Sequence, residues 1–95
     1  MADVRDNKEK HRFELAVDGA TAFVTYRRTG NVVTFLHEEV PKAFEGHGYG
    51  SRLAKGALDL VRANGDKAVA VCPFIAQYMR THPDYQDLLA VPLKK

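Results

Sequence analysis

The 95-residue sequence contains a single cysteine, no tryptophan and no long hydrophobic run. Because Cys72 has no partner for an internal disulfide, nothing predicts an oxidising compartment, and we expect a cytoplasmic protein. The longest apolar stretch, from Ala68 to Ala76, has nine residues, whereas a membrane-spanning helix needs roughly 18 or more. The sequence therefore predicts no membrane segment.

A strong excess of one charge is also missing. Lysine and arginine total 14 against 12 aspartate and glutamate residues, and the net charge of +2 is too small to predict a nucleic-acid partner. The potential metal ligands show no close paired spacing, so we expect no metal site. These residues are His11, His37, His47, His82 and Cys72.

Length and composition predict one folded domain. A chain this short has room for a single core, and its 45% hydrophobic and 27% charged residues are typical of a globular protein. The first residues are polar, with no apolar stretch behind them, so we expect no secretory signal. We expect residues 1–11 to be a flexible N-terminus and residues 12–95 to be the domain.

The segment from Arg12 to Val40 has the alternating pattern of β-strands. Asp18-Gly19 provides a two-residue turn, and Thr29-Gly30-Asn31 provides a second break. Pro41 cannot donate a hydrogen bond to a neighbouring strand and should end the third strand. This segment is therefore predicted to be a three-stranded antiparallel meander.

Helical spacing begins after a glycine-rich loop. One apolar stripe covers a helix of about four turns that should end at Asn64-Gly65. Lys67–Cys72 is predicted to be a short buried strand, and a short helix should follow from Phe74 to His82, which precedes a proline. The predicted fold class is α/β, with the meander followed by helix, strand and short helix. The stripe consists of Leu53, Ala54, Ala57, Leu58 and Val61.

The loop Gly46-His47-Gly48-Tyr49-Gly50 lies just before the long helix. The first amides of a helix lack internal partners and carry the positive end of its dipole, and glycine lets a phosphate approach closely. Arg52 and Lys55 near this helix start favour a bound anion. A plain tight turn beside a solvated basic face remains the alternative. A Walker loop is excluded because Gly50 is followed by Ser51 and Arg52, and a Rossmann turn because the preceding strands form hairpins.

These motifs resemble the GNAT superfamily of acetyl-CoA-dependent N-acetyltransferases. Gly48 and Gly50 match the glycines of its Gln/Arg-x-x-Gly-x-Gly/Ala pyrophosphate loop. The closer resemblance is to the minimal YjdJ-type N-acetyltransferase domain, over roughly Phe13 to Leu89. It is carried by His37-Glu38-Glu39-Val40-Pro41, the glycine loop, Cys72-Pro73-Phe74, Tyr78 and His82-Pro83-Asp84-Tyr85.

The resemblance implies a GNAT-like fold, acetyl-CoA as cosubstrate and a set of coenzyme-binding residues. The backbone around Val40 would pair with the pantetheine arm, and Tyr78 would contact the coenzyme. Glu45 stands where the superfamily has Gln or Arg; because its charge would repel a phosphate, we expect its side chain to turn away. The pyrophosphate would lie against the backbone of Glu45, Gly46, His47, Gly48, Tyr49, Gly50 and Ser51.

Two side chains are candidates for the acetyl-transfer chemistry. His37 is the candidate base because imidazole titrates near neutral pH, although an ordinary solvent-facing strand histidine is the alternative. Cys72 either attacks the thioester or lines the thiol site while the amine attacks directly; direct transfer is the interpretation preferred. A buried cysteine with no role in chemistry is the alternative for this position.

The sequence thus favours an N-acetyltransferase for a primary amine, which is a protein lysine, an N-terminus or a small amine. A non-catalytic CoA-binding module is the second hypothesis, because so short a chain leaves little surface for an acceptor pocket. A small interaction domain whose glycine loop is only a turn is the third. The acceptor and the oligomeric state are left open by the sequence.

Overall fold

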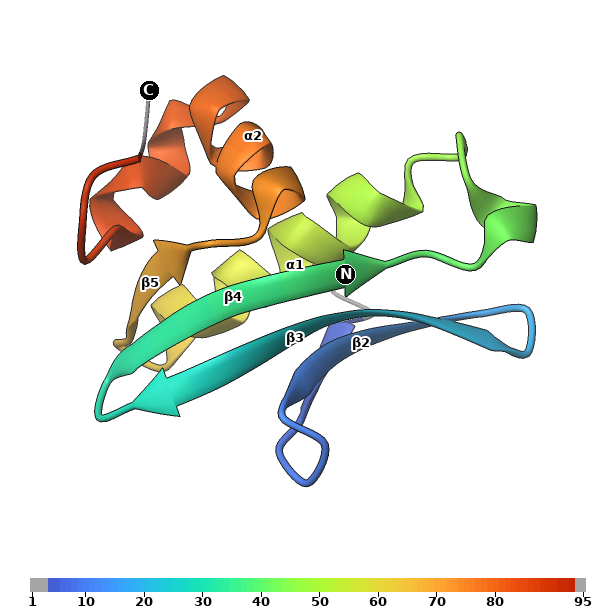
Figure 1. Ribbon diagram of the computed structural model, residues 1–95, viewed down its shortest axis with the longest axis horizontal. Coiled ribbons are helices and arrows are strands. Elements are labelled where there is room, and N and C mark those ends of the chain that lie inside the picture. The colour runs from blue at the N-terminus through green and yellow to red at the C-terminus, as the bar shows by residue number, and fades with distance from the viewer. Residues whose placement is uncertain (1–3, 94–95) are drawn as a thin grey trace.

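The computed structural model describes residues 4–93, which form a five-stranded mixed sheet with the helices of this region on one face (Figure 1). The strands follow one another across the sheet in the order β1-β2-β3-β4-β5; the first four are antiparallel neighbours, and β5 runs parallel to β4. The strands are β1 (Val4–Asn7), β2 (Arg12–Val17), β3 (Ala20–Thr29), β4 (Val32–Glu39) and β5 (Lys67–Ala70). The α/β fold and the meander are confirmed.

The first strand, β1, was not predicted. Its residues pair antiparallel with β2, Val4 opposite Leu15 and Asp6 opposite Phe13. Val4 is buried, and the Tyr26 hydroxyl donates a hydrogen bond of 2.6 Å to Asp6 Oδ1. The expectation of a flexible segment over residues 1–11 is therefore wrong for Val4–Asn7, while residues 1–3 lie outside the described residues. Backbone pairing and tertiary contacts hold a strand whose own composition is polar.

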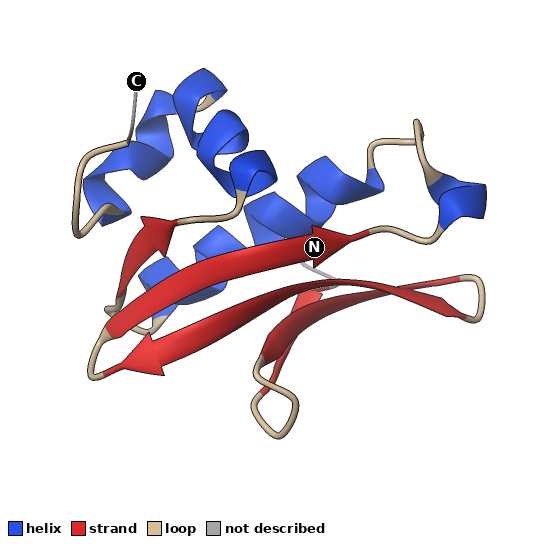
Figure 2. Ribbon diagram, in the orientation of Figure 1, coloured by secondary structure: helices blue, strands red, loops and turns tan. Residues whose placement is uncertain are grey.

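The long helix α1 (Tyr49–Ala63) packs across the sheet as predicted (Figure 2). The apolar stripe from Leu53 to Val61 is buried against the strands. The helix begins after Gly48, whose φ of 79° lies in the left-handed region that favours glycine. Asn64 caps its end, and Gly65 follows with a φ of 72°.

After α1 the chain differs slightly from expectation. The strand β5 ends at Ala70 rather than Cys72, because the N–H groups of Val71 and Cys72 both donate to the Phe35 carbonyl, at 3.1 and 2.8 Å. The helix α2 (Pro73–Thr81) starts with Pro73 at its first position, where the missing N–H has no helical partner to lose. It ends before His82, as the following proline predicts. A short 3₁₀-helix, η2 (Pro83–Leu88), follows.

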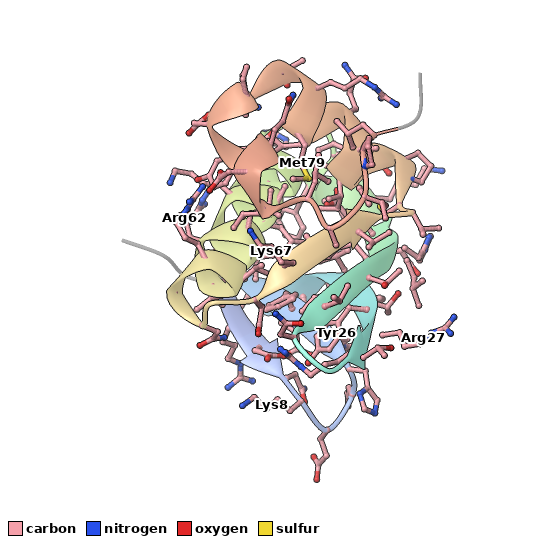
Figure 3. The ribbon with its side chains drawn as sticks, turned by 90° about the vertical axis from the view of Figure 1, so that its left-hand side faces the viewer. Lys8, Tyr26, Arg27, Arg62, Lys67 and Met79 are labelled. Carbon is pink, nitrogen blue, oxygen red and sulfur yellow. The ribbon has the colours of Figure 1, made fainter. Side chains whose placement is uncertain are left out.

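Polar contacts hold η2 against the outer side of α1. The Tyr85 hydroxyl donates to Asp59 at 2.7 Å, and Arg62 donates to both carboxylate oxygens of Asp87, at 2.8 and 2.9 Å. Figure 3 shows Arg62 on the outer surface of this layer and Met79 of α2 in its interior. Because η2 directly follows α2, these contacts hold the C-terminal end of α2 against α1.

One extra residue in β4 changes which side chains face the helices. Phe35 lies opposite Tyr26, but His37 lies opposite Thr25, so Leu36 has no partner and forms a β-bulge. Cross-strand partners share a face of the sheet. His37 therefore shares the open face with Thr25, whereas Glu38, opposite buried Val24, faces the helices.

Gly56 allows α1 to approach β1 closely. A Cβ atom at this position would lie 2.6 Å from Val4 Cβ and would also meet Val4 Cγ2. We predict that Gly56→Ala lowers the free energy of unfolding by about 1–3 kcal/mol, the usual cost of overpacking a core, when measured by urea unfolding. In a Val4→Gly background the same substitution should cost much less. Equal costs in both backgrounds would contradict the proposed contact.

Candidate functional site

A cavity of about 490 Å³ opens where the end of β4, the glycine loop and the start of α2 meet. The loop includes a 3₁₀-turn, η1 (Lys42–Phe44). The cavity is lined by His37, Glu38, Val40, Phe44, Glu45, Gly46, Gly48, Tyr49, Gly50, Ser51, Cys72, Pro73 and Phe74. Segments that are more than 20 residues apart in the chain thus share one site.

The backbone edge of β4 is open beside this cavity. Pairing between β4 and β5 ends at Phe35 and Ala70. Within residues 4–93, no residue of β5 pairs with Leu36–Glu39. Because unpaired backbone groups at a sheet edge bind an extended partner by hydrogen bonding, this edge is suited to an elongated ligand with amide groups.

The glycine loop supplies the second feature of the cavity. Gly46 and Gly48 have φ values of 82° and 79°, so each adopts a conformation that other residues rarely tolerate. The loop leads directly into the first turn of α1, whose backbone amides have no helical partners. This arrangement is suited to a phosphate or another anion.

Glu38 is a cavity residue that sequence analysis did not assign to the chemistry. Its Oε1 atom is buried and has no hydrogen-bond partner among the described residues. Its Oε2 atom lies 2.8 Å from where a Cβ of Gly50 would be, and Phe74 Cζ lies 3.1 Å from the same point. Burial raises the pKa of the Glu38 carboxyl to about 8. Such a group accepts a proton near neutral pH.

The two predicted catalytic residues both line the cavity but in different environments. Cys72 is 2% exposed and is the N-cap residue of α2. The His37 side chain is 65% exposed, and its Nε2 lies 3.3 Å from Glu39 Oε2. The thiol is thus enclosed, while the imidazole lies at the solvent-exposed rim.

Most of the predicted coenzyme-binding residues also line the cavity, but two do not. The His47 ring lies 6.2 Å from the Tyr49 ring, outside the cavity wall. Tyr78 stacks on His82 with ring centroids 3.8 Å apart and packs towards Tyr85. Glu45 is exposed at the cavity edge. The members of the predicted set that the structure brings together around the cavity are Val40, Glu45, Gly46, Gly48, Tyr49, Gly50 and Ser51.

Two other features are absent from the part of the chain that the structure describes. Among residues 4–93, no group of three or more His, Cys, Asp or Glu side chains is placed to hold a metal ion. In the same part of the chain, every helix is too short or too polar to cross a membrane.

Glu38 should make stability depend on pH. The pKa of Glu38 is about 8 in the folded protein and near 4.5 in the unfolded chain. Protonation of Glu38 therefore stabilises the folded state, and this contribution to the free energy of unfolding is fully present below the unfolded pKa and is lost as the pH rises through the folded pKa. We predict that the melting temperature of Glu38→Gln, measured by circular dichroism, rises relative to that of the wild type as the pH is raised from 5 to 9. The exposed neighbour Glu39→Gln is the matched control. A gain equal to that of the control would contradict the burial of the Glu38 charge.

Known proteins show the same architecture and sequence pattern. The family model described as GCN5-related N-acetyl-transferase matches residues 12–88. Protein NATD1 of Mus musculus is 32% identical over 83 residues, covering 84% of this chain and 76% of the relative, and that of Danio rerio is 31% identical over 88 residues, covering 90% and 80%. The solution structure of a GCN5-like protein from Staphylococcus aureus has a TM-score of 0.71 at 27% identity, covering 99% of this chain and 94% of that one. The chain therefore belongs to the GCN5-related N-acetyltransferase family of acyltransferases.

Proposed function

We propose that this chain transfers the acetyl group of acetyl-CoA to a primary amine in the cavity between β4, the glycine loop and α2. The observation that carries the proposal is the meeting of three features in that one cavity. They are the phosphate-suited loop before α1, the open edge of β4 and the half-buried carboxyl group of Glu38, whose Oε1 atom is buried and has no hydrogen-bond partner among the described residues. A small interaction domain has no need for any of them.

The residues present fit the coenzyme. The backbone from Glu45 to Ser51 would hold the diphosphate, and the open β4 edge up to Val40 would pair with the amide groups of the pantetheine arm. The coenzyme supplies an acetyl group activated as a thioester. His47 and Tyr78 lie outside the cavity wall and would contact only a part of the coenzyme that extends beyond it.

Glu38 is better placed than His37 to act as the base. The amine must lose a proton before its nitrogen can form a bond to the acetyl carbon. Glu38 faces the helices beside Phe74 and has a raised pKa, which suits proton acceptance near neutral pH. The exposed imidazole of His37 is on the opposite face of β4, next to Glu39. We therefore assign the role of proton acceptor to Glu38, and we place His37 at the cavity rim without a role in proton transfer.

Cys72 would line the thiol end of the cavity while the amine attacks directly. In this scheme the ammonium proton passes to Glu38 before attack, the N–C bond then forms as the thioester C–S bond breaks, and the second proton that the nitrogen loses passes through solvent to the departing thiolate. Cys72 is enclosed and caps the start of α2, which favours a packing role. An acetyl group found on Cys72 by mass spectrometry, after incubation with acetyl-CoA alone, would instead support transfer through the thiol.

A matched pair of amide substitutions tests the assignment of the base. Glu38→Gln should lower kcat by about 10²- to 10⁴-fold, the usual contribution of a general base, while His37→Gln should change it much less. CoA release with a panel of primary amines measures the rate, and calorimetry with CoA checks that each variant still binds. A larger loss in His37→Gln than in Glu38→Gln would reverse the assignment.

The pH profile provides an independent readout of the same assignment. The wild-type kcat/KM should rise through an apparent pKa of about 8, because Glu38 accepts a proton only when ionised. This rise should disappear in Glu38→Gln, leaving the contribution of the acceptor amine, whose own pKa is about 10.4 for a lysine. CoA binding without release of CoA in any amine assay would support the non-catalytic module instead.

A further inference from the structure

We propose that Cys72 restricts the acyl donor to the acetyl thioester, because it closes the end of the cavity where the acyl chain would lie. This inference rests on the proposed function and adds the residue that selects among acyl-CoA donors. Three observations carry it: the length of the open β4 edge, the hydrogen bonds that end this edge, and the burial of Cys72 at that end.

The open edge of β4 is as long as the pantetheine arm of the coenzyme. At about 3.5 Å per extended residue, Leu36–Glu39 span about 14 Å. The arm has about twelve bonds from its diphosphate oxygen to its sulfur, as many as about four residues of backbone, so it also spans about 14 Å when extended. With the diphosphate at the glycine loop, beyond Val40, the sulfur would therefore lie level with Leu36.

The edge closes immediately beyond Leu36. The Phe35 carbonyl accepts hydrogen bonds from the N–H groups of both Val71 and Cys72, at 3.1 and 2.8 Å. Phe35 also pairs with Ala70, the last residue of β5. These bonds join β4 to the segment that leads into α2. An acyl group attached to the sulfur would therefore meet the closed end of the cavity.

Cys72 forms the side-chain wall at this closed end. It lines the cavity and is 2% exposed. It belongs to the same buried apolar cluster as Phe35, Ile75 and Met79, which are 0% exposed. Because close-packed side chains continue the wall behind Cys72, an acyl chain has no room to extend in this direction. A longer chain would have to bend back towards Glu38, into the space that the amine needs.

The size of the Cys72 side chain sets how much of an acyl chain fits. An apolar pocket distinguishes substrates that differ by one methylene by about 10- to 200-fold. Within residues 4–93, the Cys72 side chain makes no capping hydrogen bond to α2, so Cys72→Ala opens space without leaving a capped amide unpaired. Cys72→Thr keeps the space filled, and threonine is favoured at a helix N-cap.

A series of donors tests this inference on the wild-type protein. The donors are acetyl-CoA, propionyl-CoA and butyryl-CoA, used with one amine acceptor, and CoA itself is the reference without an acyl group. CoA release gives kcat/KM, and calorimetry gives the affinity for each donor. We expect kcat/KM to fall by about tenfold with each added methylene. The affinity relative to that for CoA should fall in the same order.

Variants connect the preference to Cys72. Cys72→Ala should raise the ratio of propionyl to acetyl kcat/KM by about tenfold, whereas Cys72→Thr should keep this ratio at or below the wild-type value. Both variants lack the thiol, so a difference between them reports the space available and not thiol chemistry. Val40→Ala, which enlarges the opposite end of the cavity, is the control. It should leave the ratio unchanged, because a ratio cancels any common effect on coenzyme binding.

The outcomes separate this inference from the proposed function. Equal use of the three acyl donors by the wild type, or an unchanged ratio in Cys72→Ala, would overturn the role of Cys72 and leave the proposed function intact. Binding of acyl-CoA with no transfer to any amine would overturn the proposed function. The ratio of propionyl-CoA to acetyl-CoA affinity would then decide the inference: a rise in Cys72→Ala supports it, and no change overturns it.

Discussion

The β-bulge at Leu36 is the constraint on which the site depends. One extra residue in β4 reverses the alternation of side chains, so that Glu38 faces the helices and His37 faces the open side of the sheet. Pairing with β5 ends one residue before the bulge, at Phe35. The same irregularity therefore exposes the strand edge and directs a carboxylate towards the glycine loop.

Two glycines of α1 leave space for side chains that pack against the helix. Gly56 allows Val4 and the edge strand β1 to dock, which contributes to stability. Gly50 leaves space for the Glu38 carboxylate and the Phe74 ring, which contributes to the site. A Cβ atom at position 56 would meet the Val4 Cβ, so the helix or β1 would have to move, whereas one at position 50 would displace the ends of the Glu38 and Phe74 side chains. The close packing of this short chain and the geometry of its cavity thus depend on the same helix surface.

The partial burial of Glu38 destabilises the folded protein but gives this side chain the properties of a base. The Glu38 Oε1 atom is buried without a hydrogen-bond partner among the described residues, which is unfavourable for the charged carboxylate, and this desolvation raises the pKa of Glu38 to about 8. The surrounding structure supports it: η2 is tied to α1 through Tyr85 and Arg62, which holds the C-terminal end of α2 against α1. Such strain at a site supported by a rigid surrounding structure is common in enzymes.

The sequence by itself determined the meander, the apolar stripe of α1, the glycine loop and the family, because turns, periodicity and motifs are local. It did not determine β1, whose polar residues form a strand only through pairing with β2. Nor did it distinguish Glu38 from His37, because the bulge depends on register with β3. The position of Tyr78 away from the cavity was equally hidden, since its neighbours His82 and Tyr85 are set by the docking of η2. Contacts between distant segments, which no local pattern specifies, decided these points.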